Sequence, residues 1–202
     1  LVFGKFNAGK SSLCNFLASR FAAQGRAVQY FHLESGRIVE TAEPLREGAV
    51  ETTARLQGVC LGANLVLLDT PGLHSVTPDN AALTQRFTDG AVAVRWVASS
   101  TSRGQVLELD ELARELHRGK PLLPVVTRSD VIEEDEVDGE IVKQLRNKSP
   151  ANRSLQESDV QARGRAKLAQ MGAEDGLLLP PVSVPVHMAR EGGRGNRAQA
   201  LD

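Results

Sequence analysis

The stretch GKFNAGKSS, from Gly4 to Ser12, follows three apolar residues and decides the fold. A glycine, four residues and then Gly-Lys-Ser is the spacing of a phosphate-binding loop between a strand and a helix. Its glycines let backbone N–H groups approach phosphate oxygens, and the following helix turns its positive dipole end to the anion. We expect Lys10 to lie along the phosphates and the Ser11 hydroxyl to bind Mg²⁺. The expected nucleotide contacts of this loop are Asn7, Ala8, Gly9, Lys10, Ser11 and Ser12.

Bulk composition indicates an ordinary globular chain. It has 202 residues, 41% hydrophobic and 24% charged, with a formal net charge of −1. That size suits one large domain, or one domain with a small appendage, and the charge predicts no general attraction to nucleic acid or anionic membranes. Two cysteines, Cys14 and Cys60, make no disulfide framework, so we expect free thiols in a reducing compartment. A cytoplasmic location is expected, with peripheral membrane association left open.

Apolar runs alternate with helical patterns along the chain. This alternation predicts an α/β fold of three layers, in which a mostly parallel sheet carries helices on both faces. Two short strands around Gly62 predict one antiparallel hairpin at the edge. Helical spacing appears after Leu13, from 106 to 116 and from 137 to 145. The expected strands are 1–3, 55–61, 64–68, 91–98, 122–126 and 177–183.

Two stretches do not fit the alternation. Residues 25–53 predict a long loop with one possible strand at 27–32, and long loops in compact domains are often functional. Residues 150–175 predict a helical insertion before the last strand. We expect one domain over 1–190 and a polar tail over 191–202 that begins a truncated helix.

A second motif, LVLLDTPGLH, runs from Leu65 to His74. An apolar strand that ends in Asp69 delivers a carboxylate beside the phosphate loop, where it holds Mg²⁺ directly or through water. The Pro-Gly turn after it lets the Gly72 N–H approach a γ-phosphate with no side chain in the way.

A third motif, PVVTRSD, runs from Pro124 to Asp130 at the end of another apolar strand. The Asp130 carboxylate can accept two hydrogen bonds from guanine, and adenine offers no such pair of donors. A site built for both donors discriminates strongly, because the wrong base leaves buried polar groups unpaired. The alternative is that Ser129 or Asp130 caps the next helix.

In this order the three motifs resemble those of translation-factor-type P-loop GTPases, most closely the Era/TrmE-like and bacterial dynamin-like groups. The resemblance implies a Ras-like G domain that binds GTP and Mg²⁺ and slowly produces GDP. It also implies a switch threonine, for which Thr53 is preferred over Thr52, and base contacts from Thr127 and Arg128. The last motif of the family falls loosely on Ser183-Val184. Relatives act on ribosomes, RNA or membranes through other domains, so the partner stays undetermined.

Some residues depart from the family pattern. Leu73 stands where related GTPases carry a water-orienting glutamine. Arg128 replaces the usual lysine, and Arg95 falls in a strand expected to be buried on both faces. In relatives an asparagine at the position of Asn7 helps bind K⁺ or Na⁺, whose charge replaces an arginine finger when two G domains dimerise. The alternative for Asn7 is a local loop hydrogen bond.

The resemblance therefore predicts a GTP-hydrolysing switch, with K⁺ and a homodimer through the G domain as possible activators. The expected catalytic residues are Asn7, Lys10, Thr53 and Gly72. The expected metal ligands are Ser11, Thr53 and Asp69. Two alternatives stay open: a nucleotide-binding interaction module with negligible hydrolysis, and an ATP-using P-loop enzyme.

Overall fold

The computed structural model describes residues 1–5, 7–47, 56–69, 86–99, 109–110, 112–137 and 140–186. Its helices are α1 (Lys10–Ala22), α3 (Ala113–His117) and α4 (Pro150–Gln170), with a 3₁₀ turn at Asp175–Leu177. Its strands are β1 (Val2–Phe3), β2 (Val28–Glu34), β3 (Arg37–Thr41), β4 (Gln57–Leu61), β5 (Leu65–Asp69), β6 (Val94–Ser99), β7 (Leu122–Thr127), β8 (Asp130–Val137), β9 (Glu140–Asn147) and β10 (Val182–Val184).

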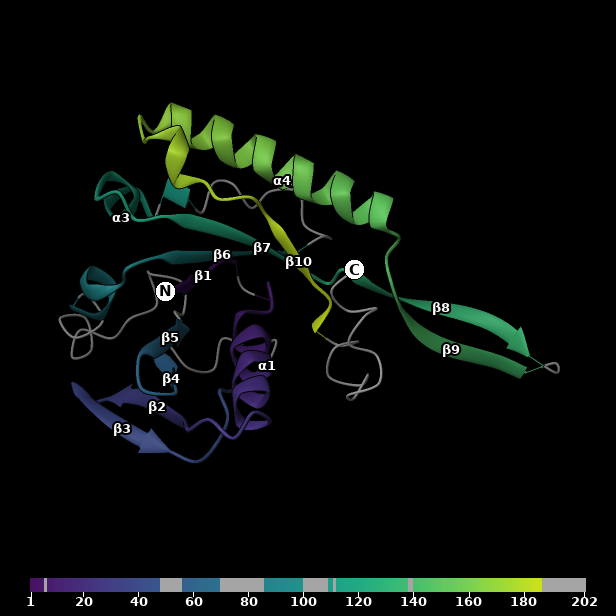
Figure 1. Cartoon of the computed structure of the whole chain (residues 1–202), viewed down its shortest axis with the longest axis horizontal. Coiled ribbons are helices and arrows are strands. Elements are labelled where there is room, and N and C mark those ends of the chain that lie inside the picture. The colour runs from purple at the N-terminus through teal and green to yellow at the C-terminus, as the bar shows by residue number, and fades with distance from the viewer. Residues whose placement is uncertain are drawn as a thin grey trace.

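The main sheet has eight strands in the order β10-β7-β6-β1-β5-β4-β2-β3 (Figure 1). Strands from β10 to β5 pair in parallel, whereas β4, β2 and β3 add an antiparallel section. The α/β class predicted from the alternation is confirmed. The hairpin around Gly62 is also found, as β4 and β5, but it lies inside the sheet and β3 forms the edge.

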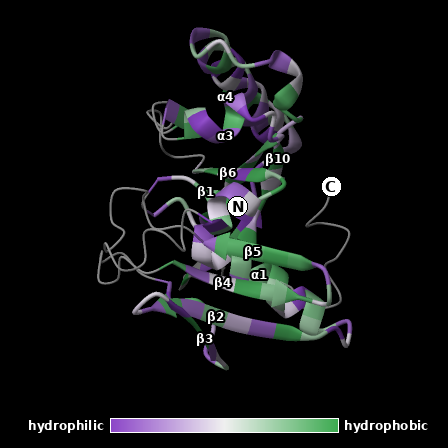
Figure 2. Cartoon of the chain, turned by 90° about the vertical axis from the view of Figure 1, so that its left-hand side faces the viewer, coloured by the Kyte–Doolittle hydropathy of each residue, from purple (hydrophilic) through white to green (hydrophobic). Residues whose placement is uncertain are grey.

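Two apolar layers hold the helices to opposite faces of the sheet. One layer contains Leu13, Cys14 and Ala18 of α1 against inward residues of β1, β4, β6 and β7. The other contains Trp96 of β6 and Leu168 of α4 with residues of α3. Figure 2 shows the apolar colouring of α1 and of the strands that it covers. The three-layer architecture therefore rests on two separate cores that share one sheet.

The expected long loop at 25–53 is wrong in its first half, although the possible strand at 27–32 within it is confirmed as β2. Residues 28–41 form the β2–β3 hairpin, whose turn at Ser35 and Gly36 has φ values of 48° and 72°. Two left-handed residues make the tight turn that matches the twist of paired strands. Phe31 and Leu33 point into the core at 5% and 0% exposure, so burial of alternate residues specifies β2.

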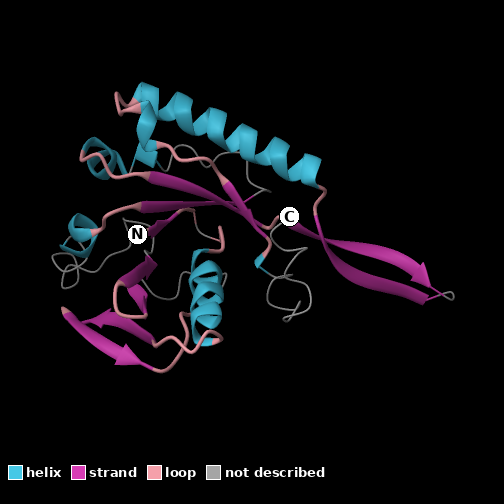
Figure 3. Cartoon of the chain, in the orientation of Figure 1, coloured by secondary structure: helices cyan, strands magenta, loops and turns pink. Residues whose placement is uncertain are grey.

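The helix expected over 137–145 is also wrong. Strands β8 and β9 pair antiparallel from Asp130↔Asn147 to Val137↔Glu140 and form a separate two-stranded ribbon. This ribbon projects away from the rest of the domain (Figure 3). Asp-Gly between two runs of alternating residues is a strong hairpin signal, and the pair Asp138-Gly139 joins these strands.

Helix α4 occupies most of the predicted helical segment at 150–175, but it is not an insertion. Strands β7 and β10 pair in parallel, and a parallel pair requires a crossover connection. Helix α4 provides that crossover, and the β8–β9 ribbon is the added element. Ser149 begins α4, since its side chain accepts a hydrogen bond from the Asn152 N–H at 3.3 Å.

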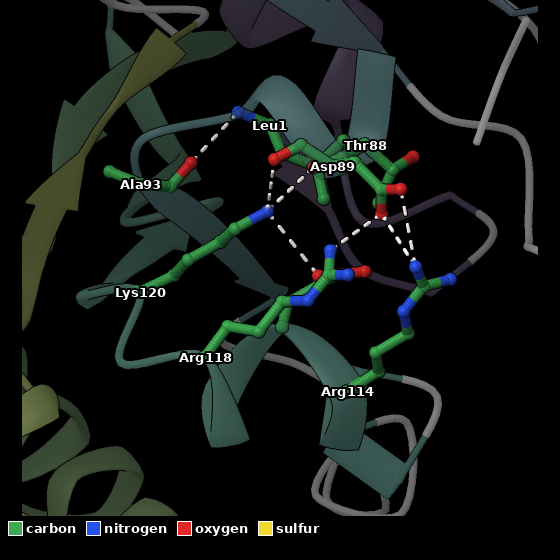
Figure 4. Close-up of polar contacts among 8 residues, drawn as sticks. Leu1, Thr88, Asp89, Ala93, Arg114, Arg118 and Lys120 are labelled. Carbon is green, nitrogen blue, oxygen red and sulfur yellow. Dashed lines mark hydrogen bonds and ion pairs between the residues drawn. The ribbon is translucent and has the colours of Figure 1, made fainter. Parts of the chain in front are cut away.

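An ion cluster, buried at one end and exposed at the other, ties the helical turn at 86–90 to the region around α3 (Figure 4). The Lys120 ammonium donates to the Thr88 carbonyl at 2.7 Å and lies 3.3 Å from the Glu115 carboxylate. Asp89 accepts from Arg114 and Arg118 on the same side. Since Lys120 and Glu115 are 8% and 4% exposed, this pair is desolvated and each charge requires the other.

Arg95 is half-buried rather than fully enclosed, which lowers the cost expected for a cation in β6.

Cys14 and Cys60 are free thiols, as predicted, and burial raises the pKa of Cys14 well above its usual range. Among the described helices, none is long and apolar enough to span a bilayer.

Candidate nucleotide-binding site

The phosphate loop packs so tightly that only glycine fits at its first position. A Cβ on Gly4 would lie 2.3 Å from the Val97 carbonyl oxygen, well inside contact distance, and Gly4 has a φ of 149°. Gly9, which begins α1, has a left-handed φ of 91°. These two glycines let the chain turn directly from β1 into α1.

The first turn of α1 is open toward an anion. Among the described residues no side chain caps it, and the turn itself contains no acidic residue, so its N–H groups keep their partial positive charge. The Lys10 ammonium lies over the same loop and donates to the carbonyls of Gly4 at 2.8 Å and Lys5 at 3.1 Å. Backbone donors and an ammonium therefore meet at one loop, which is the chemistry that binds phosphate.

Asp69 ends β5 beside this loop and is 3% exposed. Its Oδ2 accepts from the Ser11 hydroxyl at 2.6 Å and from Gln57 Nε2 at 3.0 Å. Its Oδ1 is buried, and no donor among the described residues reaches it. Burial raises the pKa of Asp69, and the two hydrogen bonds and the Lys10 charge oppose that rise only in part.

The third motif is tied directly to the phosphate loop. The Thr127 hydroxyl donates to the Ala8 carbonyl at 2.6 Å, and Arg128 Nη2 donates to the Asn7 carbonyl at 3.0 Å. Arg128 and Asn7 both have a left-handed φ, 56° and 62°, a conformation that costs a non-glycine residue about 1 kcal/mol. Such strain is typical of residues at functional sites.

Asp130 follows these contacts, half-buried at the first position of β8. The alternative that Ser129 or Asp130 caps a helix is wrong, because a strand begins there. The ribbon is also joined at its base, where the Lys148 N–H donates to the Ser129 carbonyl at 2.8 Å. The carboxylate expected to select the base thus sits where a ribbon leaves the domain.

Ser183 and Val184 lie alongside the third motif, although the sequence match there is loose. In the pairing of β10 with β7, Ser183 is opposite Val126 and Val184 is opposite Thr127. The Ser183 hydroxyl is buried and meets no hydrogen-bond partner within the described part of the chain. The segments that carry the first, third and last motifs are therefore adjacent in space.

Several predicted site residues lie outside the described residues. They include both candidates for the switch threonine and the glycine expected at the γ-phosphate, and the two residues after that glycine lie outside as well. These are Thr52, Thr53, Gly72, Leu73 and His74.

The structure adds three polar residues that the sequence reasoning missed. Besides Gln57, Asn15 of α1 binds the Leu45 backbone through both ends of its amide, at 2.8 and 3.0 Å. Glu47 accepts hydrogen bonds from Ser12 and Asn15. The signal for Gln57 was available, since pairing the strands on either side of Gly62 places it opposite Asp69.

This fold and this arrangement of loop, ammonium and strand-end aspartate define a P-loop nucleotide-binding domain. Comparison with known proteins narrows the class. Residues 1–128 match the model of the family described as 50S ribosome-binding GTPase. The chain therefore belongs to that family, and its domain is a P-loop GTPase domain.

A relative extends beyond this domain. An uncharacterised protein of Acinetobacter baylyi is 62% identical over 191 residues, which cover 95% of this chain. The chain spans only 38% of that relative's length. No solved structure matches the chain.

Proposed function

We propose that the chain binds GTP with Mg²⁺, hydrolyses it to GDP and phosphate, and acts as a nucleotide-dependent switch. The observation that carries the proposal is the direct link between the phosphate loop and the third motif. Thr127 and Arg128 bond to the carbonyls of Ala8 and Asn7, so Asp130 is held a short distance from the phosphate loop. A nucleotide with its phosphates on the loop would reach the Asp130 carboxylate with its base.

Guanine is the base that this arrangement favours. The Asp130 carboxylate accepts hydrogen bonds, and guanine presents an N1–H and a 2-amino group side by side. Arg128 carries a flat guanidinium that can lie over a planar base. The Ser183-Val184 segment lies next to them and offers further polar contact to the base.

The residues around Asp69 fit Mg²⁺. Hard oxygen ligands suit this cation, and Ser11 and Asp69 supply a hydroxyl and a carboxylate 2.6 Å apart. The buried Asp69 Oδ1 has no donor among the described residues, so a cation or its bound water would satisfy it. When bound, Mg²⁺ would neutralise charge on the β- and γ-phosphates. Lys10 would add its charge after exchanging the Gly4 and Lys5 carbonyls for phosphate oxygens.

Asn7 supports a finer proposal, that a monovalent cation assists hydrolysis. Its side chain is exposed and its backbone is left-handed at the turn of the phosphate loop. An amide oxygen there suits K⁺, whose charge would act on the transition state in place of an arginine. We propose that a second copy of the domain completes this cation site, with Thr53 and Gly72 as further catalytic residues.

The switch itself would involve the stretches on both sides of β4 and β5. Contacts to the γ-phosphate and Mg²⁺ would hold residues 48–53 and 70–80 in one arrangement, and hydrolysis would release them. The β2–β3 hairpin belongs to the sheet and is not expected to move with them.

The direct test is phosphate release from GTP and from ATP, each measured in K⁺ and in a bulky organic cation. We expect turnover with GTP, faster in K⁺, and increasing with protein concentration if dimerisation is required. Asp130→Asn should weaken the preference for GTP, whereas Asp159→Asn, on the exposed face of α4, should not. Equal turnover of ATP would contradict the proposal for GTP. Equal rates in both cations would contradict the proposal that K⁺ assists hydrolysis.

A further inference from the structure

Gln57 occupies a position that the proposed function does not explain. It lies on β4 directly opposite Asp69 of β5, and paired residues of neighbouring strands point to the same face. Gln57 Nε2 donates to Asp69 Oδ2 at 3.0 Å. The Ser11 hydroxyl donates to the same oxygen. Two donors therefore hold one carboxylate oxygen, and the other oxygen is buried and meets no donor among the described residues.

The other end of Gln57 binds the main chain. Its Oε1 accepts from the Arg46 N–H at 3.3 Å, and its Nε2 lies 3.5 Å from the Arg46 carbonyl oxygen. One side-chain amide thus connects Asp69 to the backbone of Arg46. That backbone leads within a few residues to Thr52 and Thr53.

We propose that Gln57 is a positioning residue that links the Mg²⁺ aspartate to the segment entering the switch threonines. It fixes the Asp69 carboxylate so that Oδ1 faces the metal, and it transmits a change at Asp69 to residues 45–47. This inference rests on the proposed function, because it assigns a role around the same metal site.

The neighbouring contacts show why the link is specific to Arg46. Leu45 is 5% exposed and is held by Asn15, and Glu47 is held by Ser12 and Asn15 of α1. Arg46, between them, is held by Gln57, which also donates to Asp69. Leu45 and Glu47 are therefore bound to α1, and Arg46 is bound through Gln57 to the metal ligand.

The physical reason for an effect on the metal is orientation. Residues that hydrogen-bond a metal ligand fix its direction, and their loss typically costs 10- to 100-fold in metal affinity. Gln57→Leu keeps a side chain of similar size on the strand and removes both hydrogen bonds. We expect Asp69 then to keep Ser11 as its only donor within the described residues and to populate other orientations.

The experiment compares Gln57→Leu with Gln29→Leu, the same change at an exposed site on β2. GDP affinity is measured with Mg²⁺ and with EDTA. For the unaltered chain and for Gln29→Leu, Mg²⁺ should tighten binding by the same factor. For Gln57→Leu that factor should fall by about tenfold or more, with affinity in EDTA unchanged.

A second readout needs neither nucleotide nor metal. Amide hydrogen exchange reports on Leu45 and Arg46 separately, because their N–H groups bond to Asn15 and Gln57, respectively. Gln57→Leu should speed exchange at Arg46 and leave Leu45 slow. Gln57→Asn, which is one methylene too short to span both partners, should behave similarly.

Three results would overturn the inference. The first is that Mg²⁺ tightens GDP binding to Gln57→Leu as much as it does for the unaltered chain. The second is an equal loss of affinity in Mg²⁺ and in EDTA, which indicates a merely structural strand residue. The third is unchanged exchange at Arg46. Failure of the unaltered chain to prefer GDP to ADP would instead count against the proposed function, while the exchange experiment still tests the link.

Discussion

Replacing Asp69 with asparagine should stabilise the ligand-free domain while it removes the proposed Mg²⁺ site. The carboxylate is 3% exposed, its Oδ1 meets no donor among the described residues, and burial raises its pKa. A raised pKa in the folded state means that the charged form destabilises the fold at neutral pH. Asparagine keeps an oxygen for Ser11 and Gln57 and carries no charge.

The expected gain in the free energy of unfolding is that of a single stabilising substitution. A single stabilising substitution commonly adds about 0.5–2 kcal/mol to the free energy of unfolding, and we expect removal of this buried charge to fall in that range. For a domain of this length each kcal/mol raises the melting temperature by about 2–4 °C. We therefore expect Asp69→Asn to melt a few degrees higher than the unaltered chain in EDTA at pH 7.

The pH dependence tests a second time whether Asp69→Asn raises the stability. Because the folded pKa of Asp69 lies above its unfolded value, the stability linked to its protonation is fully present at low pH. That stability is lost as the pH rises through the folded pKa. The gain from Asp69→Asn should thus be largest at pH values above the folded pKa, and it should shrink as the pH falls toward the unfolded pKa of about 4.

Calorimetry with and without ligand completes the test. Mg²⁺ and GDP at about 100 times their Kd would stabilise the unaltered chain by about 2.7 kcal/mol. If Asp69→Asn loses Mg²⁺, it receives little of this gain, so the order of the two melting temperatures should reverse. A variant that melts lower than the unaltered chain in EDTA at pH 7 would refute this reasoning.

Three further changes test the scaffold by urea unfolding. Gly4→Ala should lower the free energy of unfolding by at least about 2 kcal/mol, because its Cβ would lie 2.3 Å from a backbone oxygen of β6. The control Gly176→Ala, in open space at an ordinary φ, should lower it little. Lys120→Met should cost about 3–5 kcal/mol by leaving Glu115 buried without its ion-pair partner, and Glu115→Leu in the same chain should recover much of that loss. Replacing 133–144 by a two-residue turn should change stability by less than about 1 kcal/mol, because the ribbon is a separate sheet outside both cores.

Much of the fold follows from sequence because its strongest signals are local. The phosphate loop lies between an apolar strand and a helix, and apolar strands end in Asp69 and Thr127. Parallel strands of this kind place their carboxyl ends at one edge, so the motifs could be expected to meet there. The structure brings the described motif segments together in this way.

The errors have a common physical origin. Val137, Ile141 and Leu145 repeat with helical spacing, yet the chain at 130–147 forms a ribbon. Spacing alone does not distinguish the two structures when few side chains are buried, and the decisive signal was the Asp-Gly pair at its centre. The β2–β3 hairpin was missed in a similar way, because its turn depends on Ser35 and Gly36 rather than on composition.

Side-chain links across the site could not be derived from spacing. The contact of Thr127 with Ala8 joins residues 119 positions apart, and that of Gln57 with Asp69 depends on strand register. A register error of one residue would turn Gln57 to the other face. Predicting such contacts requires the assembled sheet as well as the motifs.

The central claim is that this phosphate-loop domain selects guanine through Asp130. The most direct measurement is equilibrium titration of the chain with fluorescent GDP and, separately, fluorescent ADP in Mg²⁺ buffer. The account predicts a preference for GDP of about a hundredfold or more, which Asp130→Asn should reduce. Equal affinities, or tighter binding of ADP, would contradict it.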